Sequence, residues 1–399
     1  MKKFTVVCLL IFACAFCFAA SEELEMYKFL YTNTQTHEDQ LALLQGMAEM
    51  KISGAGEFYA NALTRLIQNF PNISGANEKM YAENQAILLA NLIGQEKYSG
   101  AAGDLWRTYE SFSDPLVKAE ALMTLGKIRA VEFLPRVVRV MKDKNESPGN
   151  DRLSEERIAY GAVISLEKFG DMTGYLPVYF ASKGWYTQRV KSQASRSLKV
   201  ISADPTEPMI SVITGAEYIY EIKLDALQFV NTSDVSKESK SKAALAALNE
   251  GWTSGTTDTR QQGQLNTMRK FAMRMIRENG CSDNAVYALL ERSYKQFAEP
   301  INIRAGAGDR DEALDAISTL SFLATDEAVK KLSDFLMTIN GKMQSGALIR
   351  NDEDMIRAII PAIGATKNAN GRQALNVVNA LNWTSAVKVL ARDALAQLP

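Results

Sequence analysis

Apolar residues recur every three or four positions along most of this chain, and the pattern is clearest between residues 114 and 142. Asp114 and Pro115 are typical of a helix start, because an Asp side chain accepts hydrogen bonds from the first turn and Pro has no N–H to leave unsatisfied there. Leu122 lies at the centre of the apolar stripe that follows, and a second stripe begins near Phe133. The segment therefore predicts two short amphipathic helices folded back on each other.

This pair pattern recurs further along the chain. Residues 162–170 repeat the apolar spacing of residues 118–126, and the glycines that end the two stretches, Gly126 and Gly170, are 44 residues apart. Gly126 can end its helix in a left-handed conformation, although Lys127 and Ile128 can also continue that helix, and Gly94 is expected at the C-cap of an earlier helix. A lone helix pair cannot cover its own apolar faces, so the repetition indicates pairs stacked on one another. Alternating strand patterns are nearly absent, which favours an all-α fold.

The order of residue types in the 114–142 stretch resembles the HEAT repeat of the armadillo-type superhelices. The resemblance is carried by Asp114-Pro115, Val117, Leu122, Leu125-Gly126, Leu134-Pro135 and Val137. It implies a right-handed α-α superhelix (solenoid) of irregular HEAT-like helix pairs. It also implies a protein-binding activity, since that family mostly binds proteins.

The first 20 residues are predicted to be a cleaved secretory signal. Lys2 and Lys3 precede an uncharged apolar run over residues 4–18, which is shorter than the roughly 20 residues of a membrane-spanning helix. Small residues at Ala19 and Ala20 suit a signal peptidase. In a lesser alternative, Cys14 becomes the lipid-bearing N-terminus of a lipoprotein. We expect an exported protein, periplasmic or otherwise extracytoplasmic, with no transmembrane helix after cleavage.

Composition shifts divide the rest of the chain. We expect N-terminal HEAT-like repeats over residues 21–230, a polar irregular boundary over residues 231–263, and C-terminal HEAT-like repeats over residues 264–399. The boundary is predicted from turn-forming polar residues at its two ends.

Charge and cysteine content exclude several classes of function. The formal charge of −1 includes Lys2 and Lys3, so the mature chain carries about −3, whereas a general nucleic-acid binder needs a basic excess. After cleavage Cys281 is the one remaining cysteine, which excludes an intramolecular disulfide and a cysteine-based metal site. We expect its thiol to be inert, since nothing basic is adjacent in sequence.

Three motifs resemble sites for chemistry, but each has a plainer interpretation. His37 is the only histidine, and it lies at a predicted helix start, where a polar residue is ordinary. Residues 143–154 place oxygen-bearing side chains as in a calcium loop, but Pro148 stands where that loop needs Gly. The glycines of residues 306–309 lack the third glycine and the preceding strand of a phosphate loop. We therefore predict no catalytic residue, metal or cofactor.

Two surfaces are predicted to contact a partner. Lys270, Arg274 and Arg277 recur at helical spacing, with Arg269 adjacent, and form a basic stripe opposite an apolar face. Trp185 and Tyr186 follow Gly184 in a predicted turn, which makes them the best candidates for an exposed aromatic patch.

These observations favour an exported, non-catalytic, protein-binding scaffold of the bacterial cell envelope. One alternative is an enzyme or small-ligand-binding protein on a helical solenoid, such as a HEAT-like lyase. Another is a lipid-anchored envelope assembly factor. The partners are expected to be other proteins, with envelope association possible and no nucleic acid.

Overall fold

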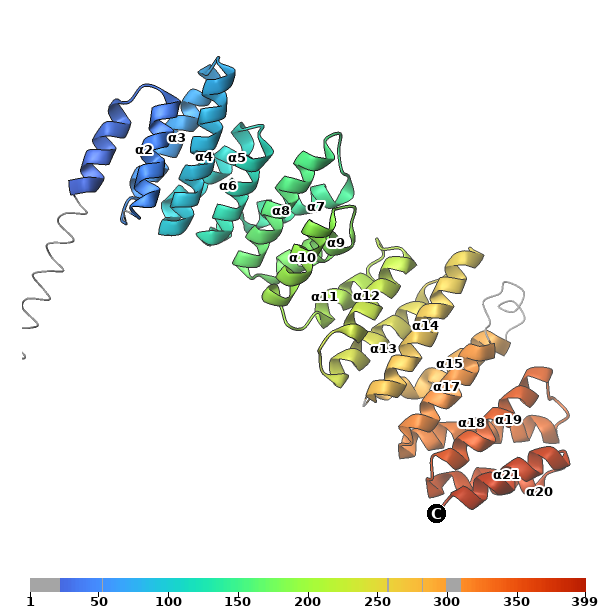
Figure 1. Cartoon of the computed structure of the whole chain (residues 1–399). Coiled ribbons are helices and arrows are strands. Elements are labelled where there is room, and N and C mark those ends of the chain that lie inside the picture. The colour runs from blue at the N-terminus through green and yellow to red at the C-terminus, as the bar shows by residue number, and fades with distance from the viewer. Residues whose placement is uncertain (1–21, 52, 257, 282, 299–309) are drawn as a thin grey trace, which may run out of the picture. The chain divides into compact units, whose positions relative to one another are not determined.

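The computed structural model of the chain describes residues 22–51, 53–256, 258–281, 283–298 and 310–399 (Figure 1). Those residues form an all-α structure in which no strand occurs. The predicted signal segment and the glycines of residues 306–309 lie outside the described residues. Within the described part of the chain, no helix is long and apolar enough to cross a membrane.

Contacts divide the chain between Ala203 and Asp204 into two compact units, called unit 1 and unit 2 here. Unit 1 begins with a helix over residues 22–33. Its further helices are α2 (His37–Glu49), α3 (Gly56–Asn69), α4 (Ala76–Glu96), α5 (Ala102–Ser111), α6 (Pro115–Lys127), α7 (Leu134–Glu146), α8 (Arg152–Phe169), α9 (Tyr175–Lys183) and α10 (Gln188–Ile201). The even-numbered helices form one row, in which α2, α4, α6, α8 and α10 each pack against the next, and the odd-numbered helices lie against this row.

Unit 2 repeats this arrangement with other helices. They are α11 (Thr206–Thr214), α12 (Tyr220–Thr232), α13 (Lys237–Thr253), α14 (Thr259–Asn279), α15 (Leu289–Ala298), α17 (Arg310–Leu323), α18 (Asp326–Gln344), α19 (Arg350–Ala365), α20 (Arg372–Ala380) and α21 (Ser385–Gln397). Here α14, α17, α19 and α21 pack in sequence, while α15, α18 and α20 lie beside them. The predicted boundary at residues 231–263 lies inside this unit, because α13 packs between α11 and α14.

The predicted start of α6 is confirmed in detail. The Asp114 carboxylate accepts hydrogen bonds from the backbone N–H of Leu116 at 2.8 Å and of Val117 at 2.9 Å. Leu122, at the centre of the apolar stripe, is fully buried, and α6 packs against α4, α5 and α8. Local capping therefore fixes where this helix begins, and the apolar stripe fixes which face meets its neighbours.

The glycines expected to end helices have another role. Gly94 and Gly126 lie inside α4 and α6, and a Cβ atom on Gly126 would lie 2.7 Å from the Cα and the carbonyl oxygen of Ser165 in α8. Gly161 of α8 is placed in the same way, since a Cβ atom there would lie 2.6 Å from the carbonyl oxygen of Ala119 in α6. Gly126 is not a left-handed cap: α6 continues to Lys127, as the alternative expected, and Gly126 serves the close approach of α6 and α8. The expectation that Gly94 ends its helix is wrong, because α4 continues to Glu96.

The chain reverses through a recurring turn instead. The non-glycine residues with a positive φ among those described are Lys51, Lys97, Arg129, Ala324 and Lys367, with φ between 50° and 54°. They follow the ends of α2, α4, α6, α17 and α19, and Gly170 holds the same place after α8 with φ 66°. After α6, the N–H of Ala130 bonds the carbonyl of Leu125 at 3.1 Å, which satisfies a carbonyl of the last turn. The same backbone solution thus joins helix pairs in both units.

We expect Leu122→Ala to lower the free energy of unfolding by about 2–5 kcal/mol, because truncation at this buried site leaves a cavity between α6 and its neighbours. Leu116→Ala is the matched control on the same helix, since Leu116 is 48% exposed, and its effect should stay within about 0.5 kcal/mol. Chemical denaturation measures both. Equal stability of the two variants would contradict the assigned orientation of α6.

A second pair of variants tests the close approach of helices in unit 2. A Cβ atom on Gly364 of α19 would lie 2.8 Å from the Cα atom of Ala394 in α21. We therefore expect Gly364→Ala to destabilise the protein by about 1–3 kcal/mol. Gly341 is also near a helix end but has no heavy atom within 4 Å of that position, so Gly341→Ala should be neutral or stabilising by up to about 1 kcal/mol. Thermal and chemical unfolding should show a loss of stability for Gly364→Ala and no loss for Gly341→Ala.

Candidate functional site

Trp185 and Tyr186 do not form the exposed patch expected from the sequence. Tyr186 is 3% exposed and its hydroxyl donates to the Oδ1 atom of Asn145 at 3.1 Å. Trp185 is partly buried, and its indole N–H donates to the carbonyl oxygen of Lys144 at 3.0 Å. The Arg152 guanidinium lies over the Trp185 ring, 5.4 Å from its centroid. The prediction of exposure is wrong for Tyr186. Trp185 and Tyr186 instead hold the end of α7 and the start of α8 against the turn that follows α9.

The predicted basic stripe on α14 is only partly a surface. Arg274 is exposed and Lys270 is half-buried. Arg277 is engaged within the protein, since its Nη1 atom donates to the Oδ1 atom of Asp315 in α17 at 2.9 Å. Arg269, expected beside the stripe, is buried. The helical spacing of these cations is confirmed, but two of them are directed to carboxylates of α17.

Arg269 forms a buried ion pair that joins α14 to α17. Its Nε atom lies 2.8 Å from the Oε1 atom of Glu312 and its Nη2 atom lies 2.9 Å from Oε2, a bidentate geometry. The side chains of Arg269 and Glu312 are 4% and 1% exposed. Arg269 also donates to the carbonyl oxygen of Gly251 and to the side chain of Asn266. Because each charge is satisfied by its partner, the pair orients the two helices rather than offering a reactive group.

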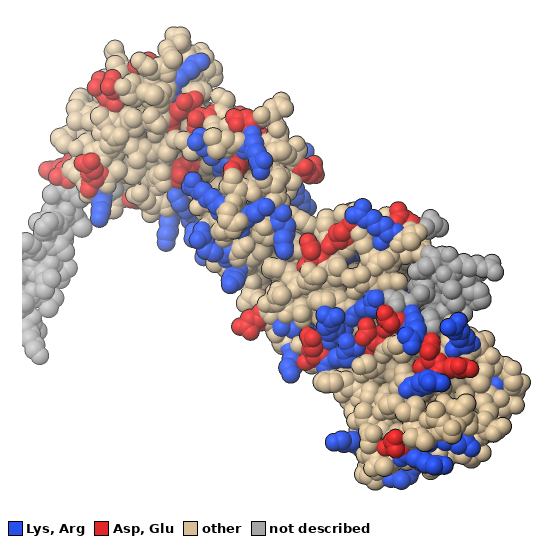
Figure 2. Space-filling view, turned by 45° about the vertical axis from the view of Figure 1, so that its right-hand side comes forward, with Lys and Arg blue, Asp and Glu red and all other residues tan. Residues whose placement is uncertain are grey.

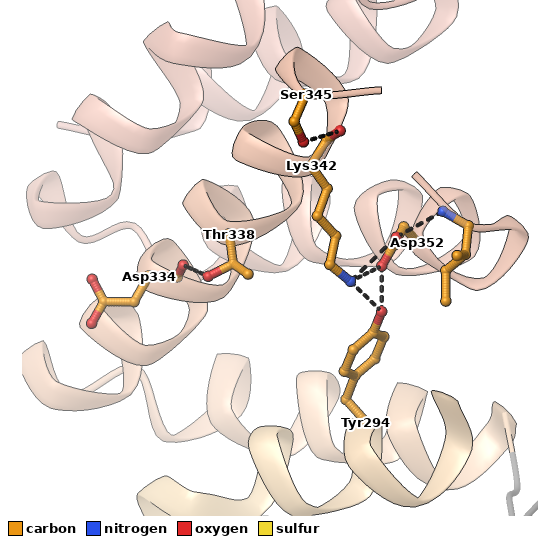
Figure 3. Close-up of polar contacts among 7 residues, drawn as sticks. Tyr294, Asp334, Thr338, Lys342, Ser345 and Asp352 are labelled. Carbon is orange, nitrogen blue, oxygen red and sulfur yellow. Dashed lines mark hydrogen bonds and ion pairs between the residues drawn. The ribbon is translucent and has the colours of Figure 1, made fainter. Parts of the chain in front are cut away.

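A second polar cluster lies in unit 2 and consists of Tyr294, Lys342 and Asp352 (Figure 3). The Lys342 ammonium is 3.1 Å from both the Tyr294 hydroxyl and the Oδ1 atom of Asp352. The hydroxyl donates to that same oxygen, and the other Asp352 oxygen accepts the backbone N–H of Ile349 at 3.0 Å. Asp352 is fully buried, so one carboxylate gathers α15, α18 and the start of α19.

The pKa shifts in this cluster favour the protonated forms of Tyr294 and Lys342. Burial raises the pKa of Tyr294, and the hydrogen bond to Asp352 adds to the effect. Burial acts to lower the pKa of Lys342, but the hydrogen bonds to Tyr294 and Asp352 outweigh it and raise that pKa. A Tyr or Lys that acts as a general base or nucleophile near neutral pH needs a lowered pKa, and both shifts here are in the other direction.

The other residues singled out in the sequence also make contacts within the fold. The Nδ1 atom of His37 is 3.0 Å from the Oε1 atom of Gln85, a fully buried residue of α4. Asp151 of the calcium-like stretch caps α8 by accepting the N–H of Ser154 at 3.2 Å. Cys281 is half-buried, and burial raises the pKa of its thiol. Among the described residues, no three His, Cys, Asp or Glu side chains come together as a metal site.

The described surface has shallow polar grooves. One lies between α18 and α20, where Asp326, Lys330 and Asp334 face Asn370 and Gln373. The groove is lined by acidic side chains, by one lysine and by two side-chain amides, and is therefore polar.

A cationic surface that the sequence patterns did not single out lies on α8 and α10. We call it the basic face, defined by Arg157 of α8 and by Arg189, Arg196 and Lys199 of α10, all exposed. The Arg189 guanidinium lies over the ring of Tyr160 in α8, 4.8 Å from its centroid, and so links the two helices. A signal for it was present, because residues 172–203 contain five Lys and Arg and no Asp or Glu.

Comparisons with known proteins assign no family to the chain. No family model matches it, and no curated protein matches it. Among solved structures, the crystal structure of an engineered protein from a structural genomics consortium is similar, with 16% sequence identity and a TM-score of 0.34, over 94% of this chain and 98% of that one. A likeness of this size carries no argument about fold or function.

The structural role of the Arg269–Glu312 ion pair can be tested by substitution. We expect Glu312→Ala to cost about 3–5 kcal/mol of unfolding free energy, because it leaves Arg269 buried and uncompensated. The double variant Arg269→Met/Glu312→Leu should recover most of that loss, since no unpaired charge remains. Asp354→Ala removes the partner of Arg310 from an exposed pair at 3.0 Å and should cost at most about 1 kcal/mol. Urea denaturation of the three variants gives the comparison, and a Glu312→Ala loss no larger than that of Asp354→Ala would contradict the role assigned here.

Proposed function

We propose that this protein is an exported, non-catalytic scaffold that binds other proteins through a solenoid of HEAT-like helix pairs. The proposal is carried by the way the helices of each unit pack on their sequence neighbours. In such an arrangement every helix buries one face and leaves another to solvent, so binding surface accumulates along the row without any catalytic group.

The chemistry of the polar clusters supports this proposal. The Arg269–Glu312 pair and the Tyr294–Lys342–Asp352 cluster are satisfied by partners inside unit 2. Their described contacts join helices, and the raised pKa values of Tyr294 and Lys342 disfavour activation. A Tyr or Lys that acts as a nucleophile or general base would need a lowered pKa.

Export is part of the proposal and rests on the first 20 residues of the sequence. A positive start followed by a short apolar run and small residues is typical of a secretory signal. A location in the cell envelope would place the scaffold among exported or membrane-bound proteins.

We expect affinity capture of the mature protein from its own envelope fraction, after brief chemical cross-linking, to recover the same partner proteins in independent preparations. The surface of stacked helix pairs is the physical reason. Peptide mass spectrometry identifies the captured proteins. Where the Glu312→Ala variant is unfolded, it serves as a control for proteins that adhere non-specifically to exposed apolar surface.

A preparation that instead retains a small molecule and captures no protein would contradict the scaffold and favour the ligand-binding alternative. N-terminal sequencing of the same material should give a start at Ala20 or Ser21. A mature N-terminus at a lipid-bearing Cys14 would instead favour the lipid-anchored alternative.

A further inference from the structure

The basic face gathers four exposed cations on two neighbouring helices, and no carboxylate of the described residues lies in ion-pair contact with any of them. Some other exposed cations of the described chain pair with acids, as in Arg107–Asp104, Lys242–Glu207 and Arg260–Glu221. Within the described residues, none of Arg157, Arg189, Arg196 and Lys199 forms an ion pair. The Arg196 side chain donates to the neutral Gln193 amide at 2.7 Å, and Arg189 lies on the Tyr160 ring.

The carboxylates nearest to this face are already used between α8 and α10. Glu167 accepts hydrogen bonds from Gln193 at 2.8 Å and from Ser197 at 2.7 Å, and it pairs with Lys168 at 3.1 Å. Glu156 is buried and accepts the backbone N–H of Thr187. These two acids hold the helices together, and Asp151 is an acid whose charge interacts with that of Arg157. Among the described residues, no ion pair neutralises Arg189, Arg196 or Lys199.

The cations of α10 form a line. Arg189, Arg196 and Lys199 are at positions i, i+7 and i+10, which places them along one side of the helix over about 15 Å. Figure 2 shows Lys and Arg side chains gathered over this C-terminal part of unit 1. The N-terminal part has the opposite balance, with fourteen Asp and Glu against eight Lys and Arg over residues 21–128. Like charges in such a row repel one another, so an anion along the line would relieve this repulsion.

We propose that the basic face binds an acidic segment of a partner protein; this inference rests on the scaffold function proposed above. A guanidinium matches a carboxylate in a two-bond geometry, and two of the three basic-face cations on α10 are Arg. The line of charge fits an extended segment that carries several Asp or Glu side chains. Complementary charge would also speed the encounter with such a partner.

An anionic membrane is the less favoured partner for this face. A helix that lies on a bilayer buries its apolar side among the lipids. The apolar side of α10, formed by Val190, Ala194 and Leu198, is instead buried in the core of unit 1. Beside its charges, the outer side of α10 offers one exposed apolar side chain, Val200, which is a small group for insertion into lipid.

The test uses the mature full-length protein and a fluorescent poly-L-glutamate peptide of about 15 residues as the probe. Binding is measured by fluorescence anisotropy at low and at high salt. We expect saturable binding at low salt that weakens as salt is added. Arg189→Gln/Arg196→Gln/Lys199→Gln should weaken it by about tenfold or more, since three exposed ion pairs are lost.

A control variant with the same change in net charge is Arg65→Gln/Lys79→Gln/Arg107→Gln, which alters exposed cations of unit 1 outside the basic face. It should bind the probe within about twofold of the unmodified protein, because only bulk charge has changed. Thermal unfolding should show both variants folded. Absence of binding by the unmodified protein, or equal losses in the two variants, would overturn the inference.

Two further measurements separate this inference from its alternatives. Co-sedimentation with vesicles of neutral or of anionic lipid should show no binding that depends on Arg189, Arg196 and Lys199. Stronger binding to anionic vesicles than to the peptide would overturn the inference in favour of a membrane. If cross-linked partners are still captured by the triple α10 variant, the scaffold stands and the basic face is not its docking site. If no partner is captured by any form, the proposed function itself fails, whatever the peptide shows.

Discussion

No helix of this protein's described rows covers its own apolar face, so each depends on the next helix in its row. This constraint explains why glycines lie where α6 meets α8 and where α19 meets α21, since the backbones approach to distances that leave no room for a side chain. It also explains the recurring left-handed turn after α4, α6 and α19, which returns the chain for the second helix of each pair. The strain of a non-glycine residue with positive φ is offset by the apolar area that the pair then buries.

Polar groups inside unit 2 follow the same constraint. Arg269 and Glu312 come from helices that pack side by side, as do Lys342 and Asp352, and each group is satisfied only when those helices are in place. Burying a charge without its partner is far more costly than burying a matched pair. The clusters therefore select one arrangement of helices.

The surface charge of unit 1 is organised differently from its interior. The acids nearest to α10 are directed inward, to hydrogen bonds with Gln193, Ser197 and Thr187, while its cations face solvent. A nearly neutral chain thus presents a locally positive face, which the net charge of the whole molecule conceals. For an array whose proposed activity is binding, such local imbalance distinguishes one stretch of surface from the rest.

The sequence by itself determined the all-α class and the start of α6, because helical periodicity and capping by Asp114 depend on residues within one or two turns. It also placed Leu122 in the core and gave the spacing of the α14 cations. Only the tertiary structure decided that Gly126 serves helix contact, that Tyr186 is buried, and that Arg269 pairs with Glu312, 43 residues away. It likewise placed the division of the chain at residue 204 and revealed the basic face. These outcomes depend on which helix lies opposite, and local periodicity shows that a face is apolar or charged without identifying what it meets.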